Sequence, residues 1–151
     1  MRYDLLKHWY IIPATILYSI LIVCLLQSCA RAEEIDLDKI AMIESSHNPK
    51  AYNKHSQAMG TYQITPICLA DYNNYNAPRI DKNDLFSHEI NEKVAVWYLT
   101  KRIPQMLKHY GFQDTVENRL ISYNCGIGCV GKPLPTETKN YIEKYSRLSQ
   151  W

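Results

Sequence analysis

The sequence predicts a mainly α-helical fold built as one globular domain. Apolar residues recur at intervals of three and four in several stretches of residues 33–151, which is the spacing of one face of a helix. Turn-forming residues separate these stretches, and the regular alternation of strands and helices that a parallel sheet requires is not visible. A stretch of this length can bury one hydrophobic core and is too short for two.

The first helix is expected over residues 37–44, with Asp36 as its N-cap. It cannot continue far, because Asn48 precedes a proline and therefore disfavours the α region. The two serines after Glu44 also compete for backbone hydrogen bonds. We therefore expect Glu44 to lie on the last turn of this helix, beside a loop.

Three further helices are expected after Pro78. Pro104 is expected to kink the first of these three or to end it. The second stops at Gly126, and the third begins near Thr136. Between the helix at residues 37–44 and Pro78, we expect only a short apolar segment, residues 61–67. The residues that predict the three later helices are Ile90, Val94, Trp97, Tyr98, Lys101, Val116, Leu120, Tyr123, Tyr141, Tyr145 and Leu148.

Glu44 is placed where the first helix should show an apolar side chain. It follows Leu37, Ile40 and Ala41 at helical spacing, in line with side chains that face the core. Partial burial disfavours the charged form of a carboxyl group, so we expect the pKa of Glu44 to rise from about 4.3 towards neutrality. A general acid that works near pH 7 requires such a pKa.

Residues 1–32 have the layout of a secretory signal, with a basic start, an apolar middle and small residues at the end. Three alternatives are open for this segment: cleavage after Ala32, acylation of Cys29 as in a lipoprotein, or retention of residues 9–30 as a membrane anchor. Cleavage is favoured, because Gln27 is unusual in a lipoprotein signal. All three alternatives export the domain at residues 33–151 and leave the membrane in contact with the N-terminal segment alone.

The charge of the exported domain argues against a nucleic-acid partner. The formal net charge of +2 resides in residues 1–32, so that residues 33–151 are neutral and contain no basic run. Proteins that bind nucleic acid depend on Lys and Arg contacts to phosphate. A neutral, carbohydrate-like polymer is therefore a more suitable partner.

No metal or cofactor is expected. The histidines of the exported domain show no ligand spacing with one another or with its cysteines. Residues 126–131 fit the dinucleotide pattern G-x-G-x-x-G, but a helix precedes them and prolines follow, whereas that pattern needs a strand before it and a helix that opens inside it.

The exported domain contains three cysteines, Cys68, Cys125 and Cys129. In an oxidising compartment two of them can pair, which leaves one over. Cys125 with Cys129 is the local candidate, and a bond from Cys68 to either is equally allowed.

Four segments of the chain, in order, resemble the soluble lytic transglycosylase family. Residues 44–51 read Glu-Ser-Ser-His-Asn-Pro-Lys-Ala, residues 60–64 read Gly-Thr-Tyr-Gln-Ile, and residues 122–128 read Ser-Tyr-Asn-Cys-Gly-Ile-Gly. Residues 137–142 read Glu-Thr-Lys-Asn-Tyr-Ile. The resemblance spans residues 44–142 and implies a lysozyme-like, mainly α-helical fold with a minimal β element.

The resemblance also implies an enzyme, a peptidoglycan lytic transglycosylase. Such an enzyme cleaves the β-1,4 bond between N-acetylmuramic acid and N-acetylglucosamine without water and leaves 1,6-anhydro ends. Glu44 would be the catalytic acid, which protonates the glycosidic oxygen and then takes the proton of the muramic 6-hydroxyl. The next carboxylate in the sequence is Asp71, so a scheme with one acid suits the chain.

The family motifs place further candidate residues in the substrate site. Gln63 matches a glutamine that lines the groove, and Tyr123 matches a tyrosine near the acid, whose hydroxyl is expected to reach that acid or a substrate acetamide. Asn124 is a candidate that we expect mainly to shape the turn after its helix. Glu137 matches a supporting glutamate at the start of the last helix, where the helix dipole also favours an acid. Asn53 stands where a serine is common in the family.

The resemblance implies a monomer in the periplasm that acts on peptidoglycan glycan strands. The small size of the domain suggests local wall opening for a secretion, conjugation or pilus apparatus. Two alternatives stay open. One is a goose-type lysozyme-like hydrolase, in which a second carboxylate positions water, and the other is a peptidoglycan-binding scaffold protein without activity.

Overall fold

The structure of the chain, a computed structural model, describes residues 34–148. The expected signal segment, with Cys29, lies outside these residues, so that the domain boundary at residue 33 stays a prediction. The helices are α2 (Leu37–Ser45), α3 (Pro66–Tyr75), α4 (His88–Trp97), α5 (Ile103–His109), α6 (Val116–Cys125) and α7 (Thr136–Arg147). Shorter helical turns are η1 (Lys82–Phe86), η2 (Tyr98–Arg102) and η3 (Ile127–Cys129).

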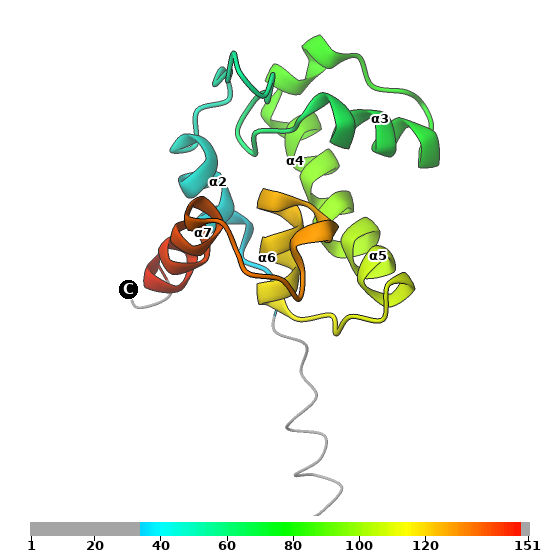
Figure 1. Cartoon of the computed structure of the whole chain (residues 1–151). Helices are drawn as coiled ribbons and strands as arrows, with labels where there is room; N and C mark the ends of the chain where they lie inside the picture. Colours follow the sequence, from blue (N-terminus) through cyan, green and yellow to red (C-terminus); the bar gives the residue numbers. More distant parts are fainter. Residues whose placement is uncertain (1–33, 149–151) are drawn as a thin grey trace, which may run out of the picture. The chain divides into compact units, whose positions relative to one another are not determined.

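The mainly helical fold that the sequence predicts is confirmed. Strand-like pairing within residues 34–148 consists of two isolated bridges, Tyr52 with Met59 and Met59 with Ile64. Helix α2 lies beside α7, and α6 packs against both α7 and α5 (Figure 1). The core contains Ile40, Ile64, Leu85, Val94, Leu99, Ile103, Leu107 and Leu120, each no more than 2% exposed.

Helix α2 begins as the sequence predicts. The Asp36 side chain accepts hydrogen bonds from the backbone N–H groups of Asp38 (3.0 Å) and Lys39 (3.3 Å), which is an N-cap. The helix ends at Ser45, and Ser46 follows with a left-handed φ of 53°. Glu44 is therefore the penultimate residue of α2.

Helix α3 was not predicted. The sequence indicated only an apolar segment at residues 61–67, whereas a helix begins at Pro66 and continues to Tyr75. Thr65 caps it by accepting a hydrogen bond from the backbone N–H of Cys68 (3.3 Å), and a proline at the first helical position is pre-organised for the start of a helix. The buried face of α3 is hard to recognise in the sequence, because Ile67 and Tyr75 are apolar but lie off that face, 80% and 60% exposed.

The chain remains helical from α4 through η2 to α5, so Pro104 does not end this run. The residues before the proline form a π-helical turn, in which the Ile103 N–H bonds the Tyr98 carbonyl five residues back. Such a turn absorbs the disturbance that a proline causes inside a helix. The side chains of Arg102 and Asp71 pair at 2.6 Å and join this turn to α3.

A fully buried asparagine attaches the loop between α2 and α3 to α4. Asn91 donates hydrogen bonds to the carbonyls of Met59 (2.8 Å) and Leu85 (2.9 Å) and accepts one from the Tyr62 N–H (2.8 Å). Gly60 is needed beside it, because its φ is 76° and a Cβ there would lie 2.3 Å from the Asn91 amide nitrogen. The loop is therefore held rigidly where it carries residues 60–64.

Helices α6 and α7 match their predicted positions. Thr115 caps α6 through a hydrogen bond from the Asn118 N–H (3.1 Å), and α6 ends before Gly126, whose φ is 88°. Helix α7 begins at Thr136, as expected. Within residues 34–148, no helix has both the length and the apolar character that a membrane span needs.

Candidate active site

Glu44 sits where the end of α2 meets the loop that Asn91 holds. The Ser45 hydroxyl donates to the Thr61 carbonyl (2.7 Å), which joins the last turn of α2 to residues 60–63. Ile40 and Ala41, one turn earlier, are buried in the core, while Glu44 is half-buried. The acid therefore lies at the border between the core and the loop.

Burial raises the pKa of Glu44 from its ordinary value of 4.5 to about 7. Two smaller effects oppose each other: the Tyr141 hydroxyl, a donor that acts on the carboxylate, lowers this pKa, and the negative charge of Glu137 raises it. The direction agrees with the expectation from the apolar stripe of α2. Near pH 7 the carboxyl group exists in both protonation states, as a group that gives and later takes a proton requires.

Tyr141 was missed as a site residue, since its spacing marked it only as part of the apolar stripe of α7. It is 6% exposed, and its hydroxyl is the one buried side-chain polar atom within residues 34–148 that lacks a hydrogen bond of standard geometry. The hydroxyl acts on the Glu44 carboxylate. Burial, and after it the charge of Glu44, raises the pKa of Tyr141 well above 10. Tyr141 follows Glu137 by four residues and so shares its helix face, but this spacing does not distinguish a site tyrosine from a core tyrosine.

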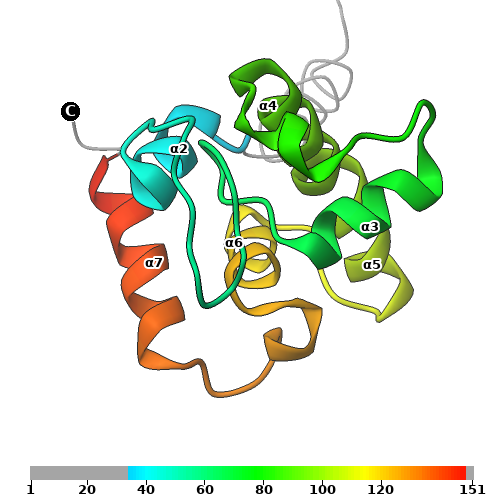
Figure 2. The same ribbon diagram turned by 90° about the horizontal axis from the view of Figure 1, so that it is seen from above.

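The hydroxyl of Tyr123 does not bond the acid, which was one of its two expected partners, the other being a substrate acetamide. It donates instead to the backbone carbonyl of Tyr62 at 2.7 Å and so fastens the loop to α6. In the view of Figure 2 the segment between α2 and α3 crosses over α6, in agreement with this bond. Tyr123 is still close enough for the charge of Glu44 to contribute, after burial, to its raised pKa.

Gln63 lies in the loop held by Asn91, with a left-handed φ of 49°. Its side-chain amide nitrogen donates to the Gly60 carbonyl at 3.0 Å, which fixes the orientation of the side chain. Within residues 34–148 its amide oxygen has no hydrogen-bond partner, so this acceptor is available to a ligand.

Asn124 and Glu137 both lie near the contact of α6 with α7. We expected Asn124 mainly to shape the turn after its helix. The hydrogen bond that the structure shows is to α7, because its amide oxygen accepts from the Thr138 hydroxyl at 2.8 Å. Thr138 is 2% exposed, so this bond is part of the core contact between the two helices. Glu137 is exposed on the first turn of α7, and its charge acts on Glu44.

The hydrogen bonds of Asn53 do not connect it to Glu44. Its side-chain oxygen accepts from the backbone N–H groups of His55 (2.9 Å) and Ser56 (3.2 Å), and the residue is exposed. The side chain therefore stabilises the loop around itself.

The cysteines resolve the alternatives that the sequence left open. Cys125 and Cys129 form a disulfide that encloses residues 126–128, and Cys68 is a buried free thiol. Burial raises the pKa of Cys68 to about 12, so its thiol is not a reactive nucleophile. Residues 34–148 hold no group of three His, Cys, Asp or Glu side chains placed to bind a metal ion.

Comparison with known proteins gives one match. No curated protein and no solved structure matches the chain significantly. The family described as Transglycosylase SLT domain matches residues 30–146, which is most of the chain, and so confirms the resemblance and the lysozyme-like helical fold class. This family implies an activity of the lytic transglycosylase type on peptidoglycan, outside the cytoplasm. The chain belongs to the transglycosylase SLT domain family.

Proposed function

We propose that the protein is a peptidoglycan lytic transglycosylase that cleaves the β-1,4 bond between N-acetylmuramic acid and N-acetylglucosamine and leaves 1,6-anhydro-muramic ends. The observation that carries the proposal is Glu44, a half-buried carboxyl at the end of α2 with its pKa raised to about 7. We assign the catalytic role to this residue.

The reaction has two halves and consumes no water. In the first half, protonated Glu44 gives its proton to the glycosidic oxygen, the bond from that oxygen to C1 of the muramic acid breaks, and the N-acetylglucosamine leaves as an alcohol. In the second half, the Glu44 carboxylate takes the proton of the muramic 6-hydroxyl while O6 bonds to C1. Glu44 is then protonated again and ready for the next bond.

Tyr141 supports the second half of this reaction. Its hydroxyl stabilises the carboxylate form of Glu44, which is the form that accepts the proton. The hydroxyl is buried and makes no hydrogen bond of standard geometry among residues 34–148, so the Glu44 carboxylate is the group to which it is placed to donate. We therefore assign Tyr141 a positioning role.

The remaining family residues are proposed to contribute to substrate binding, either directly or through the segments that they hold in place. Gln63 offers a free amide oxygen to a sugar hydroxyl or acetamide. Tyr123 and Asn124 act mainly through the loop and helix contacts that they make, and Asn53 acts through its own loop. Glu137 acts on Glu44 through its charge and is exposed enough to meet substrate.

One observation favours a second candidate, a goose-type lysozyme-like hydrolase. Sugar hydrolases usually need two carboxylates, and Glu137 lies within electrostatic range of Glu44. However, the charge of Glu137 is the weakest of the three effects on the pKa of Glu44, and its side chain is exposed. We therefore retain the transglycosylase as the main proposal.

Mass spectrometry of digested peptidoglycan tests the proposal. The full-length protein and its Glu44→Gln variant are each incubated with purified peptidoglycan, and the ends of the products are identified. We expect 1,6-anhydro-muramic ends from the wild type alone. Reducing ends would support the hydrolase, and the absence of products from both proteins would support a peptidoglycan-binding scaffold.

We also propose a cellular setting, from the N-terminal segment and the size of the domain. Residues 1–32 would export the domain at residues 33–151 to the periplasm, where it would act as a monomer. Its small size suits local wall opening for a secretion, conjugation or pilus apparatus. Deletion of the gene tests this role: if every envelope apparatus still assembled normally, the role would be excluded.

A further inference from the structure

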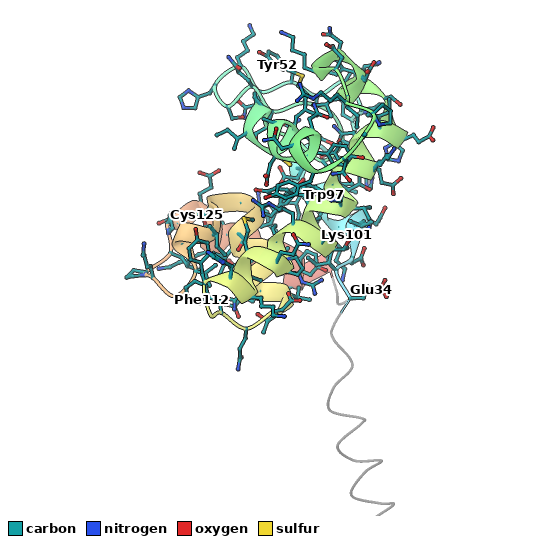
Figure 3. The ribbon with its side chains drawn as sticks, turned by 90° about the vertical axis from the view of Figure 1, so that its right-hand side faces the viewer. Glu34, Tyr52, Trp97, Lys101, Phe112 and Cys125 are labelled. Atoms are coloured by element: carbon teal, nitrogen blue, oxygen red, sulfur yellow. A yellow bond between two sulfur atoms is a disulfide. The ribbon has the colours of Figure 1, made fainter. Side chains whose placement is uncertain are left out.

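A cavity of about 400 Å³ lies between helix α3 and the continuous run of α4 and η2, and none of the residues placed at the candidate active site lines it. Its volume is within the range of small-molecule sites, which is about 300–1,000 Å³. In Figure 3 two of its lining residues, Trp97 and Lys101, lie at mid-height of the domain, between Tyr52 above and Phe112 below. The cavity is therefore a separate feature, for which the proposed reaction has no use.

One face of the run of α4 and η2 forms most of the cavity wall. Glu89, Lys93, Trp97 and Lys101 follow one another at intervals of four residues, and all of them line the cavity. Residues at this spacing are neighbours on a helix surface, so the two lysines flank the indole along the helix. At 1.5 Å per residue this row is about 18 Å long, which is longer than a single sugar ring. The cavity is thus a groove that follows the helix.

Trp97 provides an aromatic floor whose orientation is fixed from α3. The rings of Tyr72 and Tyr75 pack against the indole, with their centroids 5.2 and 6.1 Å from its own. The indole is only half-buried, so part of its surface is open to a ligand. Its N–H has no hydrogen-bond partner within residues 34–148, yet it is not a buried group. Because the floor is already ordered, little entropy is lost when a ring stacks on it.

Charged groups of both signs surround this floor in equal number. Glu89 and Glu92 supply two carboxylates, and Lys93 and Lys101 supply two ammonium groups. Glu92 is partly engaged, since it accepts a hydrogen bond from the Tyr62 hydroxyl at 3.4 Å. Within the part of the chain that the structure describes, the side chains of Glu89 and of both lysines make no ion pair or hydrogen bond. Three charged side chains beside the indole are therefore available to a ligand.

This lining suits a neutral sugar better than a charged ligand. An anion bound at the lysines would also meet the carboxylates, and a cation would meet the lysines, so a charge gains little on balance. A sugar hydroxyl both donates and accepts, and can therefore bond groups of either sign. The Asn76 side chain donates to the Tyr72 carbonyl at 2.9 Å, which leaves its amide oxygen as a further acceptor. The apolar face of the sugar ring would stack on Trp97.

We propose that the groove between α3 and α4 is a second glycan-binding site, which takes a neutral strand of N-acetylglucosamine type and has no part in the cleavage. The choice of glycan rests on the proposed function, since peptidoglycan is a polymer of such sugars. Peptidoglycan presents many strands side by side, so the two sites need not share one strand. A protein that is attached at the groove meets the strands around it at a raised effective concentration.

The binding test uses an oligomer of four N-acetylglucosamine units and the full-length protein with Glu44→Gln, which lacks the proposed acid. The oligomer is titrated into this protein, and the backbone amides and the Trp97 indole N–H are followed by NMR. Two variants are made in the same background: Trp97→Ala removes the floor, and Lys93→Ala with Lys101→Ala removes the donors. The control is Lys144→Ala, an exposed lysine of α7 that does not line the groove.

We expect the Trp97 indole and the amides of residues 93–101 to shift in the background protein. The affinity measured at these amides should fall about tenfold in Trp97→Ala and about threefold in the double lysine variant, and it should not change in the control. The two lysines are exposed, so their variant decides the question if Trp97→Ala does not fold. The absence of shifts at residues 93–101, or equal affinities in all variants, would overturn the proposal.

An activity measurement tests the role of the groove in attachment to the wall. The protein with Glu44 intact is compared with its double lysine variant on whole peptidoglycan and on short soluble strands. We expect the variant to lose about threefold more activity on whole peptidoglycan than on short strands, because only the wall offers a second point of attachment. An equal effect on both substrates would overturn this role.

The titration separates this inference from the proposed function, because it needs no turnover. Shifts in the groove that the variants weaken would support the second site even if the protein cleaved no glycan. Their absence would overturn the inference even if the protein proved to be an active transglycosylase.

Discussion

The hydroxyl of Tyr141, on the last helix of the domain, acts on the carboxylate of Glu44, on the first helix described. The packing of α7 beside α2 brings the two groups together. The hydroxyl favours the charged form of Glu44, whereas burial favours its neutral form, and burial is the larger effect. Tyr141 thus moderates the pKa that we consider essential for the reaction.

Tyr141→Phe should move the pH dependence of the enzyme. Loss of the hydroxyl raises the pKa of Glu44 further, so the acid stays protonated to higher pH. The alkaline limb of the kcat/KM profile should therefore move to higher pH. We also expect kcat to fall about tenfold, since a hydrogen bond to a charged group contributes about 1.5 kcal/mol. The measurement is a pH profile of wild type and variant. An unmoved alkaline limb would contradict the positioning role.

Tyr123→Phe is the matched comparison on α6. This variant loses the hydrogen bond to the Tyr62 carbonyl, which should cost about 1 kcal/mol of stability. Because Tyr123 is not among the effects that shift the pKa of Glu44, the alkaline limb should stay where it is. Chemical denaturation and the same pH profile check both statements, and a limb that moved as far as in Tyr141→Phe would show that the two tyrosines are equivalent.

The stability of the domain should depend on the charge of Glu44. The pKa of Glu44 is about 7 in the folded protein and near 4.5 when exposed, so the folded state binds an extra proton between these values. The stabilising effect of that proton is complete below about pH 4.5 and is lost as the pH rises through 7. Over this window the wild type should lose about 3 kcal/mol relative to Glu44→Gln. Urea unfolding of both proteins at pH 4.5, 6 and 8 measures the difference, and parallel curves would be inconsistent with a pKa of Glu44 that folding raises.

Gly60→Ala should be much more damaging than Gly111→Ala, although both glycines have a φ of 76°. At Gly60 the added Cβ would lie 2.4 Å from the Leu85 carbonyl oxygen and as close to Asn91, whereas at Gly111 nothing lies within 4 Å. We expect about 1 kcal/mol for the strained backbone alone and at least about 3 kcal/mol where the clash is added. Thermal unfolding compares the two variants, and equal losses would mean that the contact with Asn91 has no energetic importance.

The sequence predicted those elements whose signals are local. The N-cap at Asp36, the glycine after α6 and the tyrosine stripe of α7 each depend on a few neighbouring residues, and α2, α6 and α7 were placed nearly to the residue. Helix α3 was missed because exposed apolar residues interrupt its stripe, although the pair Thr65 and Pro66 marked its start.

The parts of the site that were not predicted depend on contacts between distant segments. Nothing near Tyr123 in the sequence indicates that its hydroxyl bonds the Tyr62 carbonyl, and nothing near Asn124 indicates its bond to Thr138. Glu44 could be singled out because it is a carboxylate in line with the apolar, core-facing residues of its own helix. Tyr141 could not, since a buried tyrosine on an apolar stripe looks like any core residue until its hydroxyl is found beside the acid.

The three hydrogen bonds of Asn91 have a consequence for motion in the loop that carries Gln63. Loops usually exchange their amide hydrogens by small local openings. The Tyr62 N–H, however, bonds a side chain that is fully buried and is itself part of α4. This amide can meet solvent only when α4 leaves the core, so it should exchange as slowly as the most protected helical amides. In the terms of hydrogen exchange, this loop belongs to the same cooperative unit as the hydrophobic core.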